Sequence, residues 1–261
     1  MRLAGNLSWL YRDLDWGDRF AAAARDGFRA VEILLPYDEP PRWYVEQLRA
    51  SGLSLVLINT PVGKGPGRLG WAAVPGAEDE FGRAFDQARA VAAETGCRSI
   101  HVMAGHVADH DALECGSTLR RNLARALALA EADDLVLTLE ALNRQDVPGY
   151  FYWQPQQVIT VLREFDAPRL RLQFDFYHCM KEGLDLASTV QACVAWTGHA
   201  QIAGTDGRHE PDLQEHGLAE AVATLATLGY DGWLGCEYAP RGRAGEGLGW
   251  CEPLRARGVI A

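Results

Sequence analysis

The chain has 261 residues, 48% of them hydrophobic, and a formal net charge of −10. This length and apolar content allow one large α/β domain or two small ones, and no stretch reaches the roughly 18 apolar residues that a membrane span needs. The negative charge argues against nucleic-acid binding, which depends on clustered Lys and Arg, and without an apolar leader after Met1 we expect a cytoplasmic protein.

Short apolar runs alternate with longer amphipathic segments along the chain, a pattern typical of repeated β-strand and α-helix units. The expected strands are residues 3–8, 30–34, 54–59, 99–104, 135–140, 170–175, 199–203 and 233–238. The expected helices are residues 16–26, 42–51, 78–95, 117–132, 155–164, 186–196 and 218–228, with an ambiguous last segment at 245–256. Several of these helices are followed at once by a glycine that can end them.

Eight expected strands in a chain of this length, with no break in composition, favour a single (β/α)8 TIM barrel domain over residues 1–261. The alternative is an open doubly wound sheet. That fold usually has a glycine-rich phosphate-binding turn after its first strand, where this chain has Asn6-Leu7-Ser8-Trp9-Leu10. We expect the Pro- and Gly-rich residues 61–67 to form a long loop over the barrel mouth.

Four of the expected strands each carry one oxygen-bearing side chain near their end, namely Glu140, Asp175, Gln201 and Glu237. A lone carboxylate in an apolar run is costly to bury unless something pairs with it or binds it. The four residues are spaced by 35, 26 and 36 positions, each close to one strand–helix unit of a barrel. We therefore expect them near the carboxyl ends of consecutive strands, the face where barrel active sites are built.

The alternation of side chains along a strand predicts which way these residues point. In residues 171–175 the polar positions share one face, and the apolar positions share the face that we expect beneath the helices. By the same alternation Glu140 points with Thr138, and Gln201 points with His199.

Three carboxylates and one amide oxygen meeting in a barrel mouth would repel one another strongly without a cation. An all-oxygen set suits a hard divalent ion such as Mg²⁺ or Mn²⁺, with water or substrate completing the coordination. The alternative is that the four are separate buried polar residues, each satisfied by neighbouring amides or arginines. The regular spacing favours a metal site formed by Glu140, Asp175, Gln201 and Glu237.

A second group of candidate metal ligands, His101, His106 and His110, lies around the end of the fourth expected strand. His106 and His110 have the i, i+4 spacing of helical zinc ligands. No Glu follows His106 directly, and Gly105 argues against a continuous helix, so we favour a loop near the mouth. The six cysteines form no Cys-x-x-Cys pair that would indicate a zinc-thiolate site.

Several short motifs spread along the chain are specific when taken together. They are Asn6-Leu7-Ser8, Gly27-Phe28-Arg29-Ala30-Val31-Glu32, Pro36-Tyr37-Asp38, Pro75-Gly76, Leu139-Glu140 with Asn143, Pro148-Gly149, Asp175-Phe176-Tyr177-His178, Gly198-His199-Ala200-Gln201-Ile202-Ala203, Arg208 with Glu210-Pro211, and Gly229-Tyr230-Asp231-Gly232-Trp233-Leu234-Gly235-Cys236-Glu237-Tyr238. Through them the chain resembles the hydroxypyruvate isomerase family, within the xylose-isomerase-like TIM barrels, over nearly its whole length. The resemblance implies that Glu140, Asp175, Gln201 and Glu237 hold a divalent metal, and that Glu140 and Glu237 are also the acid/base pair.

The resemblance implies an isomerase that interconverts hydroxypyruvate and tartronate semialdehyde (2-hydroxy-3-oxopropanoate) through an enediolate. The alternatives are a 2-oxo-tetronate isomerase and a ketose 3-epimerase. It also implies that His178 and Arg208 contact the substrate. Arg208 offers a planar fork for a carboxylate or hydroxyls, and a neutral His178 could donate to a substrate oxygen. Their alternative roles are a surface arginine and a loop histidine bonded to the backbone.

The chain departs from the family pattern at positions that line the substrate pocket in the resemblance. Cys179-Met180 stands where a Gln is common, and Asp212 stands where a Gly is usual. The loop after the third strand is also atypical, with Pro66 and Leu69-Gly70-Trp71.

Two functions from other classes stay open, and so does the oligomeric state. A metal-dependent phosphodiesterase on damaged DNA would need a histidine-rich zinc site and a basic face, which the net charge disfavours. A non-catalytic binding protein that kept the fold is the other alternative. We expect exposed aromatic residues at Trp43, Tyr44 and 150–153, which could form a homo-oligomer interface or a lid, or could pack within mouth loops.

Overall fold

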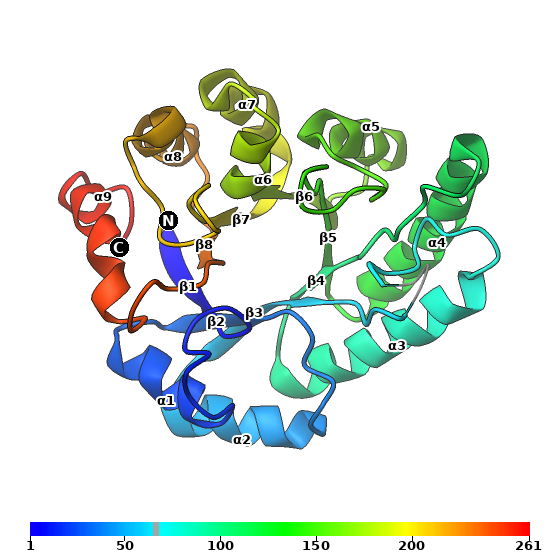
Figure 1. Cartoon of the computed structure of the whole chain (residues 1–261). Helices are drawn as coiled ribbons and strands as arrows, with labels where there is room; N and C mark the ends of the chain where they lie inside the picture. The colour runs from blue at the N-terminus through cyan, green and yellow to red at the C-terminus, as the bar shows by residue number, and fades with distance from the viewer. Residues whose placement is uncertain (65–67) are drawn as a thin grey trace.

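The computed structural model describes residues 1–64 and 68–261, and in this part of the chain eight parallel strands form a closed barrel (Figure 1). The strands are β1 (Arg2–Asn6), β2 (Ala30–Ile33), β3 (Ser54–Asn59), β4 (Ser99–His101), β5 (Val136–Glu140), β6 (Leu170–Asp175), β7 (Thr197–Ile202) and β8 (Trp233–Cys236). Each strand pairs with the next in sequence, and β8 pairs with β1 to close the ring. The predicted (β/α)8 TIM barrel is confirmed.

Helices surround the strands in chain order (Figure 1). They are α1 (Asp18–Arg25), α2 (Pro41–Ser51), α3 (Glu78–Thr95), α4 (Ala112–Ala132), α5 (Pro155–Phe165), α6 (Phe176–Lys181), α7 (Leu186–Cys193), α8 (Leu218–Thr227) and α9 (Glu252–Ala256). Short 3-10 helices span Val194–Trp196, Glu215–Gly217 and Glu246–Cys251. The ambiguous segment at residues 245–256 is therefore a 3-10 helix that leads into α9.

Two helix ends differ from the prediction by more than two residues, and local capping explains the first of them. α4 begins at Ala112, five residues before the expected start, since one carboxylate oxygen of Asp111 accepts the backbone N–H groups of Leu113 and Glu114 at 3.0 Å. α7 ends at Cys193, and the expected continuation of that helix is the 3-10 turn Val194–Trp196. The part of the expected mouth loop at residues 65–67, which includes Pro66, lies outside the described residues.

Helix α6 was not predicted, and it starts directly where β6 ends. Asp175, the last residue of β6, is its N-cap and accepts the backbone N–H of Tyr177 at 2.8 Å. The strand therefore turns into a helix with no loop between them. This arrangement holds the side chains of Tyr177 and His178 at the rim of the barrel.

The barrel wall separates an apolar outer layer from a polar interior, as the alternation of side chains predicted. Leu172 and Phe174 of β6 belong to the hydrophobic core beneath the helices. Gln173 between them points inward, where its amide bonds Thr138 and Gln201 of the neighbouring strands. Most of the apolar side chains therefore pack between the strands and the helices. Polar groups occupy the barrel interior near the carboxyl ends of the strands.

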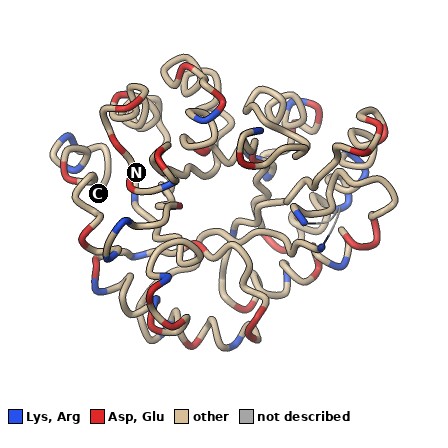
Figure 2. Tube along the Cα trace, in the orientation of Figure 1, with Lys and Arg blue, Asp and Glu red and all other residues tan. Residues whose placement is uncertain are grey.

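The outer helices carry acidic and basic residues close together, as Figure 2 shows around the ring. Many of them form exposed ion pairs, for example Arg120 with Glu164 and Arg257 with Glu220. Such pairs contribute little to stability because solvent screens them. In residues 1–64 and 68–261, none of the helices combines the length and the apolar character needed to cross a membrane.

The aromatic residues considered for an exposed patch are partly buried. Tyr44, Tyr150 and Tyr152 are each at most 4% exposed, so the prediction of exposure is wrong for these three. The Tyr150 hydroxyl accepts the backbone N–H of Ala104 at 2.9 Å, and the ring of Tyr44 packs edge-on against Trp43. These contacts support the alternative of packing within the loops and helices.

Candidate active site

The four oxygen-bearing side chains lie at the carboxyl ends of four consecutive strands. Glu140 and Asp175 are the last residues of β5 and β6, Gln201 lies in β7, and Glu237 follows β8 directly. In the strand register Asp175 is paired with Gln201, whereas Glu140 is paired with Gln173 and Gln201 with Gly235. All four are at most 6% exposed. The structure thus gathers three carboxylates and one amide in a buried position at one end of the barrel.

Arg208 from the loop after β7 is the cation that these carboxylates contact. Its Nη2 lies 3.1 Å from Oε2 of Glu237 and 3.5 Å from Oδ2 of Asp175. The guanidinium also stands between the rings of Trp9 and Tyr177, at 4.7 and 4.6 Å from their centroids. Stacking on two aromatic faces holds the guanidinium plane in place. Arg208 is therefore a fixed element of the site and not a surface side chain.

Burial sets the protonation of the carboxylates when no cation is bound. It raises the pKa of Glu237 to about 8 and that of Asp175 to about 6, although Arg208 lowers both. Burial, together with the nearby charges of Glu237 and Asp175, raises the pKa of Glu140 well above its usual range. These groups therefore favour bound protons or a bound cation over a set of free negative charges.

His178 has a single consistent tautomer in this structure. Its Nδ1 lies 3.0 Å from the backbone N–H of Asn143, so Nδ1 is an acceptor and Nε2 carries the proton. Nε2 lies 3.6 Å from Oδ2 of Asp175 and 3.8 Å from Oε1 of Glu140. Burial lowers the pKa of His178 well below its usual range, so the ring is neutral. A neutral donor thus faces the two carboxylates.

The residues fit a hard divalent cation. Oε1 of Glu140 is buried and has no hydrogen-bond partner among the described residues, which is unfavourable for a carboxylate oxygen unless something binds it. Carboxylate oxygens of Glu140 and Asp175 lie within 4.8 Å of each other and of a ring nitrogen of His178. The carboxylate of Glu237 instead contacts Arg208 and accepts the indole N–H of Trp9 at 3.1 Å. Carboxylate and amide oxygens are the donors that Mg²⁺ and Mn²⁺ prefer.

A buried polar network beneath the four residues was not predicted. Glu32 of β2 is fully buried, and its Oε2 accepts from Asn6 at 3.0 Å and from the amide of Gln201 at 2.9 Å. Its Oε1 lies 2.5 Å from Nε2 of His199. A Cβ on Gly235 would come within 1.9 Å of Oε1, so only glycine fits beside this carboxylate. The signal was present in the sequence, since Glu32 is also a lone carboxylate within an apolar strand.

The three histidines considered as zinc ligands are separated by the fold. His101 is the last residue of β4 and lies inside the barrel, with Nδ1 3.4 Å from Oε2 of Glu140. His106 and His110 lie in the following loop and are partly exposed. The backbone of His106 forms an isolated antiparallel β-bridge with that of Tyr150. Among the described residues, the grouping suited to a metal includes none of the three.

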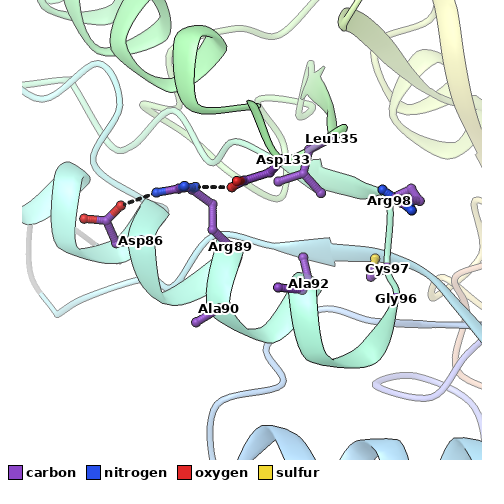
Figure 3. Close-up of a pocket in the computed structure, with 10 residues that line it drawn as sticks. Asp86, Arg89, Ala90, Ala92, Gly96, Cys97, Arg98, Asp133 and Leu135 are labelled. Carbon is purple, nitrogen blue, oxygen red and sulfur yellow. Dashed lines mark hydrogen bonds and ion pairs between the residues drawn. The ribbon is translucent and has the colours of Figure 1, made fainter. Parts of the chain in front are cut away.

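A surface depression of about 510 Å³ lies at the opposite end of the barrel, next to the segments that lead into β4 and β5 (Figure 3). Arg89 stands there between Asp86 and Asp133, with nitrogen–oxygen distances of 2.9 and 2.5 Å. Two carboxylates already neutralise this arginine, so it offers little net attraction to an anion. The side chains of the candidate active site lie at the other end of the barrel, at the carboxyl ends of the strands.

Comparisons with known proteins agree with the fold. The family described as xylose isomerase-like TIM barrel matches residues 20–254. The chain is 42% identical to a 2-oxo-tetronate isomerase of Cupriavidus necator, covering 98% of this chain and 99% of that protein. It is 31% identical to the hydroxypyruvate isomerase of Escherichia coli, covering 98% of this chain and 100% of that protein.

A solved structure extends this similarity to the whole fold. The chain is 32% identical to a protein from Brucella melitensis described as AP endonuclease, family 2, with a TM-score of 0.90 and coverage of 97% of this chain and 98% of that one. Identities of 31% to 42% over nearly complete chains show common descent, whichever of these names a relative carries. The chain therefore belongs to the hydroxypyruvate isomerase family, within the xylose isomerase-like TIM barrels, and it is an enzyme of the isomerase class.

Proposed function

We propose that this protein is a metal-dependent isomerase of short hydroxy-oxo acids, which moves a carbonyl group between two adjacent carbons through an enediolate. Hydroxypyruvate and 2-oxo-tetronate, the substrates in the names of its relatives, are the first candidates. The observation that carries the proposal is the convergence of Glu140, Asp175 and Glu237 around one buried position beside Arg208. These residues supply both a place for a cation and carboxylates that exchange protons.

We assign Glu140, Asp175, Gln201 and Glu237 as the residues that hold Mg²⁺ or Mn²⁺. The unpartnered Oε1 of Glu140 and the raised pKa values of the carboxylates support this assignment. When bound, the ion would polarise the substrate carbonyl and stabilise negative charge that develops on the substrate oxygens.

Glu140 and Glu237 are the proposed acid/base pair. They lie on β5 and directly after β8, so two strands separate them and a substrate between them presents a different side to each. One carboxylate takes the proton from the carbon next to the carbonyl, and a proton is returned to the adjacent carbon. His178 donates from Nε2 to a substrate oxygen. The backbone N–H of Asn143 donates to Nδ1, so the proton of the neutral ring is on Nε2.

Arg208 is the proposed partner of the substrate carboxylate. An acidic protein attracts an anionic substrate only where a local cation overcomes its overall charge, and Arg208 is such a cation inside the site. Its Nη1 forms no hydrogen bond or ion pair to the described residues, so donors stay free for a ligand. This supports an acid over a neutral ketose, and therefore an isomerase over a ketose 3-epimerase.

The test is an assay of the purified chain with Mg²⁺ or Mn²⁺ against hydroxypyruvate, 2-oxo-tetronate, a ketohexose and a DNA duplex with an abasic site. We expect turnover of at least one oxo acid, loss of activity with EDTA, and restoration by either ion. The DNA arm tests the activity in the name of the Brucella relative. Cleavage of that DNA without turnover of either oxo acid would overturn the proposal.

Two variants separate catalysis from folding in the same assay. Glu237→Gln keeps the shape of the side chain but cannot accept a proton, so we expect activity to fall by about a hundredfold or more. Glu164→Gln alters only an exposed pair with Arg120 and should leave activity unchanged. Full activity in Glu237→Gln would favour a protein in which Glu237 has no catalytic role.

A further inference from the structure

Two buried side chains on the far side of the mouth have polar atoms that make no hydrogen bond among the described residues. Oδ1 of Asn59, at the end of β3, and both ring nitrogens of His101, at the end of β4, make no hydrogen bond among the described residues. Asn59 is 8% exposed and His101 is 1% exposed. Burying such groups without partners costs free energy, so native proteins rarely keep them without a reason.

The strand register places these two groups together inside the barrel. Asn59 and His101 are direct partners in the β3–β4 pairing, so their side chains leave the sheet on the same face. His101 lies on the inner face, since its Nδ1 is 3.4 Å from Oε2 of Glu140. Asn59 therefore also points inward, next to the proposed metal ligands.

The backbone around this pair is held firmly, so the unpaired atoms do not reflect a loose strand end. Tyr37 donates its hydroxyl to the backbone carbonyl of Asn59, and the Asn59 N–H donates to the carbonyl of Leu34 at 2.9 Å. The hydroxyl of Thr60 accepts the N–H of Met103 at 3.0 Å, which ties the ends of β3 and β4 together. The side chains of Asn59 and His101 therefore face the mouth from a backbone that is held by hydrogen bonds.

The chemistry of this pair fits a hydroxyl group of the substrate. Asn59 offers an acceptor oxygen, and a neutral imidazole offers one N–H donor and one acceptor nitrogen. A hydroxyl donates one hydrogen bond and accepts others, so it can satisfy both residues at once. A carboxylate would only accept, and Arg208 on the opposite side is better suited to it.

The positions in the ring place Asn59 and His101 across the mouth from Arg208. In a closed barrel of eight strands, β3 and β4 lie opposite β7 and β8, where Arg208 and Glu237 are found. A substrate whose carboxylate contacts Arg208 and whose other end contacts Asn59 would span the mouth between these strands. Hydroxypyruvate has three carbons, namely the carboxylate and the reacting pair, whereas 2-oxo-tetronate has a fourth that carries a hydroxyl.

The geometry points to Asn59 and His101 as a hydroxyl-binding subsite, and to a four-carbon hydroxy-oxo acid as the substrate. This inference rests on the proposed isomerase function and specifies its substrate. It predicts that the enzyme prefers 2-oxo-tetronate over hydroxypyruvate because only the longer acid satisfies the two buried side chains.

The test compares kcat/KM for 2-oxo-tetronate and hydroxypyruvate in the Mn²⁺-loaded wild type, Asn59→Leu and Asn59→Asp. Leu and Asp both match the shape of Asn, but only Asp keeps the acceptor oxygen. We expect Asn59→Leu to lower the preference for 2-oxo-tetronate by about tenfold, and Asn59→Asp to retain it. Asn59 is the position to vary because His101 contacts Glu140, so changing His101 would also disturb the proposed catalytic carboxylate.

Tyr152→Phe is the matched control. The Tyr152 hydroxyl is another buried oxygen without a partner, but the charges nearest to it are Arg120 and Glu164 on the outer helices. Its removal should leave the substrate preference unchanged. A preference in Asn59→Leu equal to that of the wild type would overturn the subsite.

A binding measurement on the wild type makes the test independent of how well the variants fold. We expect erythronate, a four-carbon hydroxy acid, to inhibit about tenfold more strongly than three-carbon glycerate. Equal inhibition by the two acids would also overturn the subsite. Failure of the wild type to turn over either oxo acid would instead overturn the proposed function, so the two failures are distinguishable.

Discussion

Glu32 and His199 lie 2.5 Å apart inside the barrel, although 167 positions separate them in the chain. The second oxygen of Glu32 accepts the amide of Gln201 at 2.9 Å. Two contacts orient the Gln201 amide, because its nitrogen donates to Glu32 and its oxygen accepts the amide N–H of Gln173 at 2.7 Å. A carboxylate on β2 thus helps to direct a proposed metal ligand on β7.

Replacing Glu32 with Gln should weaken metal binding. A Gln side chain at this position can turn its amide nitrogen toward Gln201 and His199, so Gln201 loses one of the two contacts that orient its amide. Partners that orient metal ligands typically contribute about 10- to 100-fold in affinity, and we expect a loss in that range for Mn²⁺ measured by titration calorimetry. An affinity equal to that of the wild type would show that Glu32 does not orient Gln201.

Replacing Gly235 with Ala should destabilise the fold. The added Cβ would stand 1.9 Å from Oε1 of Glu32, and the fully buried network leaves it nowhere to move. We expect a loss of about 1–3 kcal/mol in the free energy of unfolding, measured by urea denaturation. The control is Gly249→Ala, where a Cβ meets no atom within 4 Å, and a similar loss in both variants would contradict the explanation.

The stability of the metal-free protein should decrease as the pH rises from about 5 to about 8. The raised pKa values of Asp175, about 6, and Glu237, about 8, mean that the native state holds these protons more tightly than the unfolded chain. The stabilising effect is therefore complete below the unfolded pKa of about 4 and is lost as the pH passes the native values.

Thermal unfolding in EDTA and in saturating Mn²⁺ checks this pH dependence. Protons compete with the ion for the same carboxylates, so the increase in Tm caused by Mn²⁺ should be larger at about pH 8 than at about pH 6. Glu237→Gln removes the group with the pKa of about 8 and should flatten the EDTA curve. A Tm in EDTA that rises over this interval, or a Glu237→Gln curve identical to the wild type, would be evidence against the raised pKa values.

Replacing Arg208 with Lys should separate acidic from neutral substrates. Lysine keeps the charge but loses the planar fork and the stacking between Trp9 and Tyr177. We expect kcat/KM for an oxo acid to fall on the order of tenfold to a hundredfold, mainly through KM, with little change for any slow turnover of a neutral ketose. Arg241→Lys, at an exposed arginine paired with Asp206, is the control. Equal losses for both substrate types would mean that Arg208 does not bind the carboxylate.

The sequence by itself determined the barrel fold and the end of the barrel at which the proposed metal site lies. Apolar runs alternating with amphipathic segments defined the strands and helices. Each element buries its own apolar face, so its apolar residues recur with the period of that element. The spacing from Glu140 to Asp175, one strand–helix unit, then placed both at carboxyl ends of neighbouring strands, as the structure has them. These features depend only on local patterns and on the repeat length.

Only the tertiary structure decided which distant side chains meet. The contacts of Glu32 with His199 and of His101 with Glu140 depend on the stagger between strands. No periodicity within a segment encodes that stagger, since it results from closing the ring so that eight strands pair without an edge.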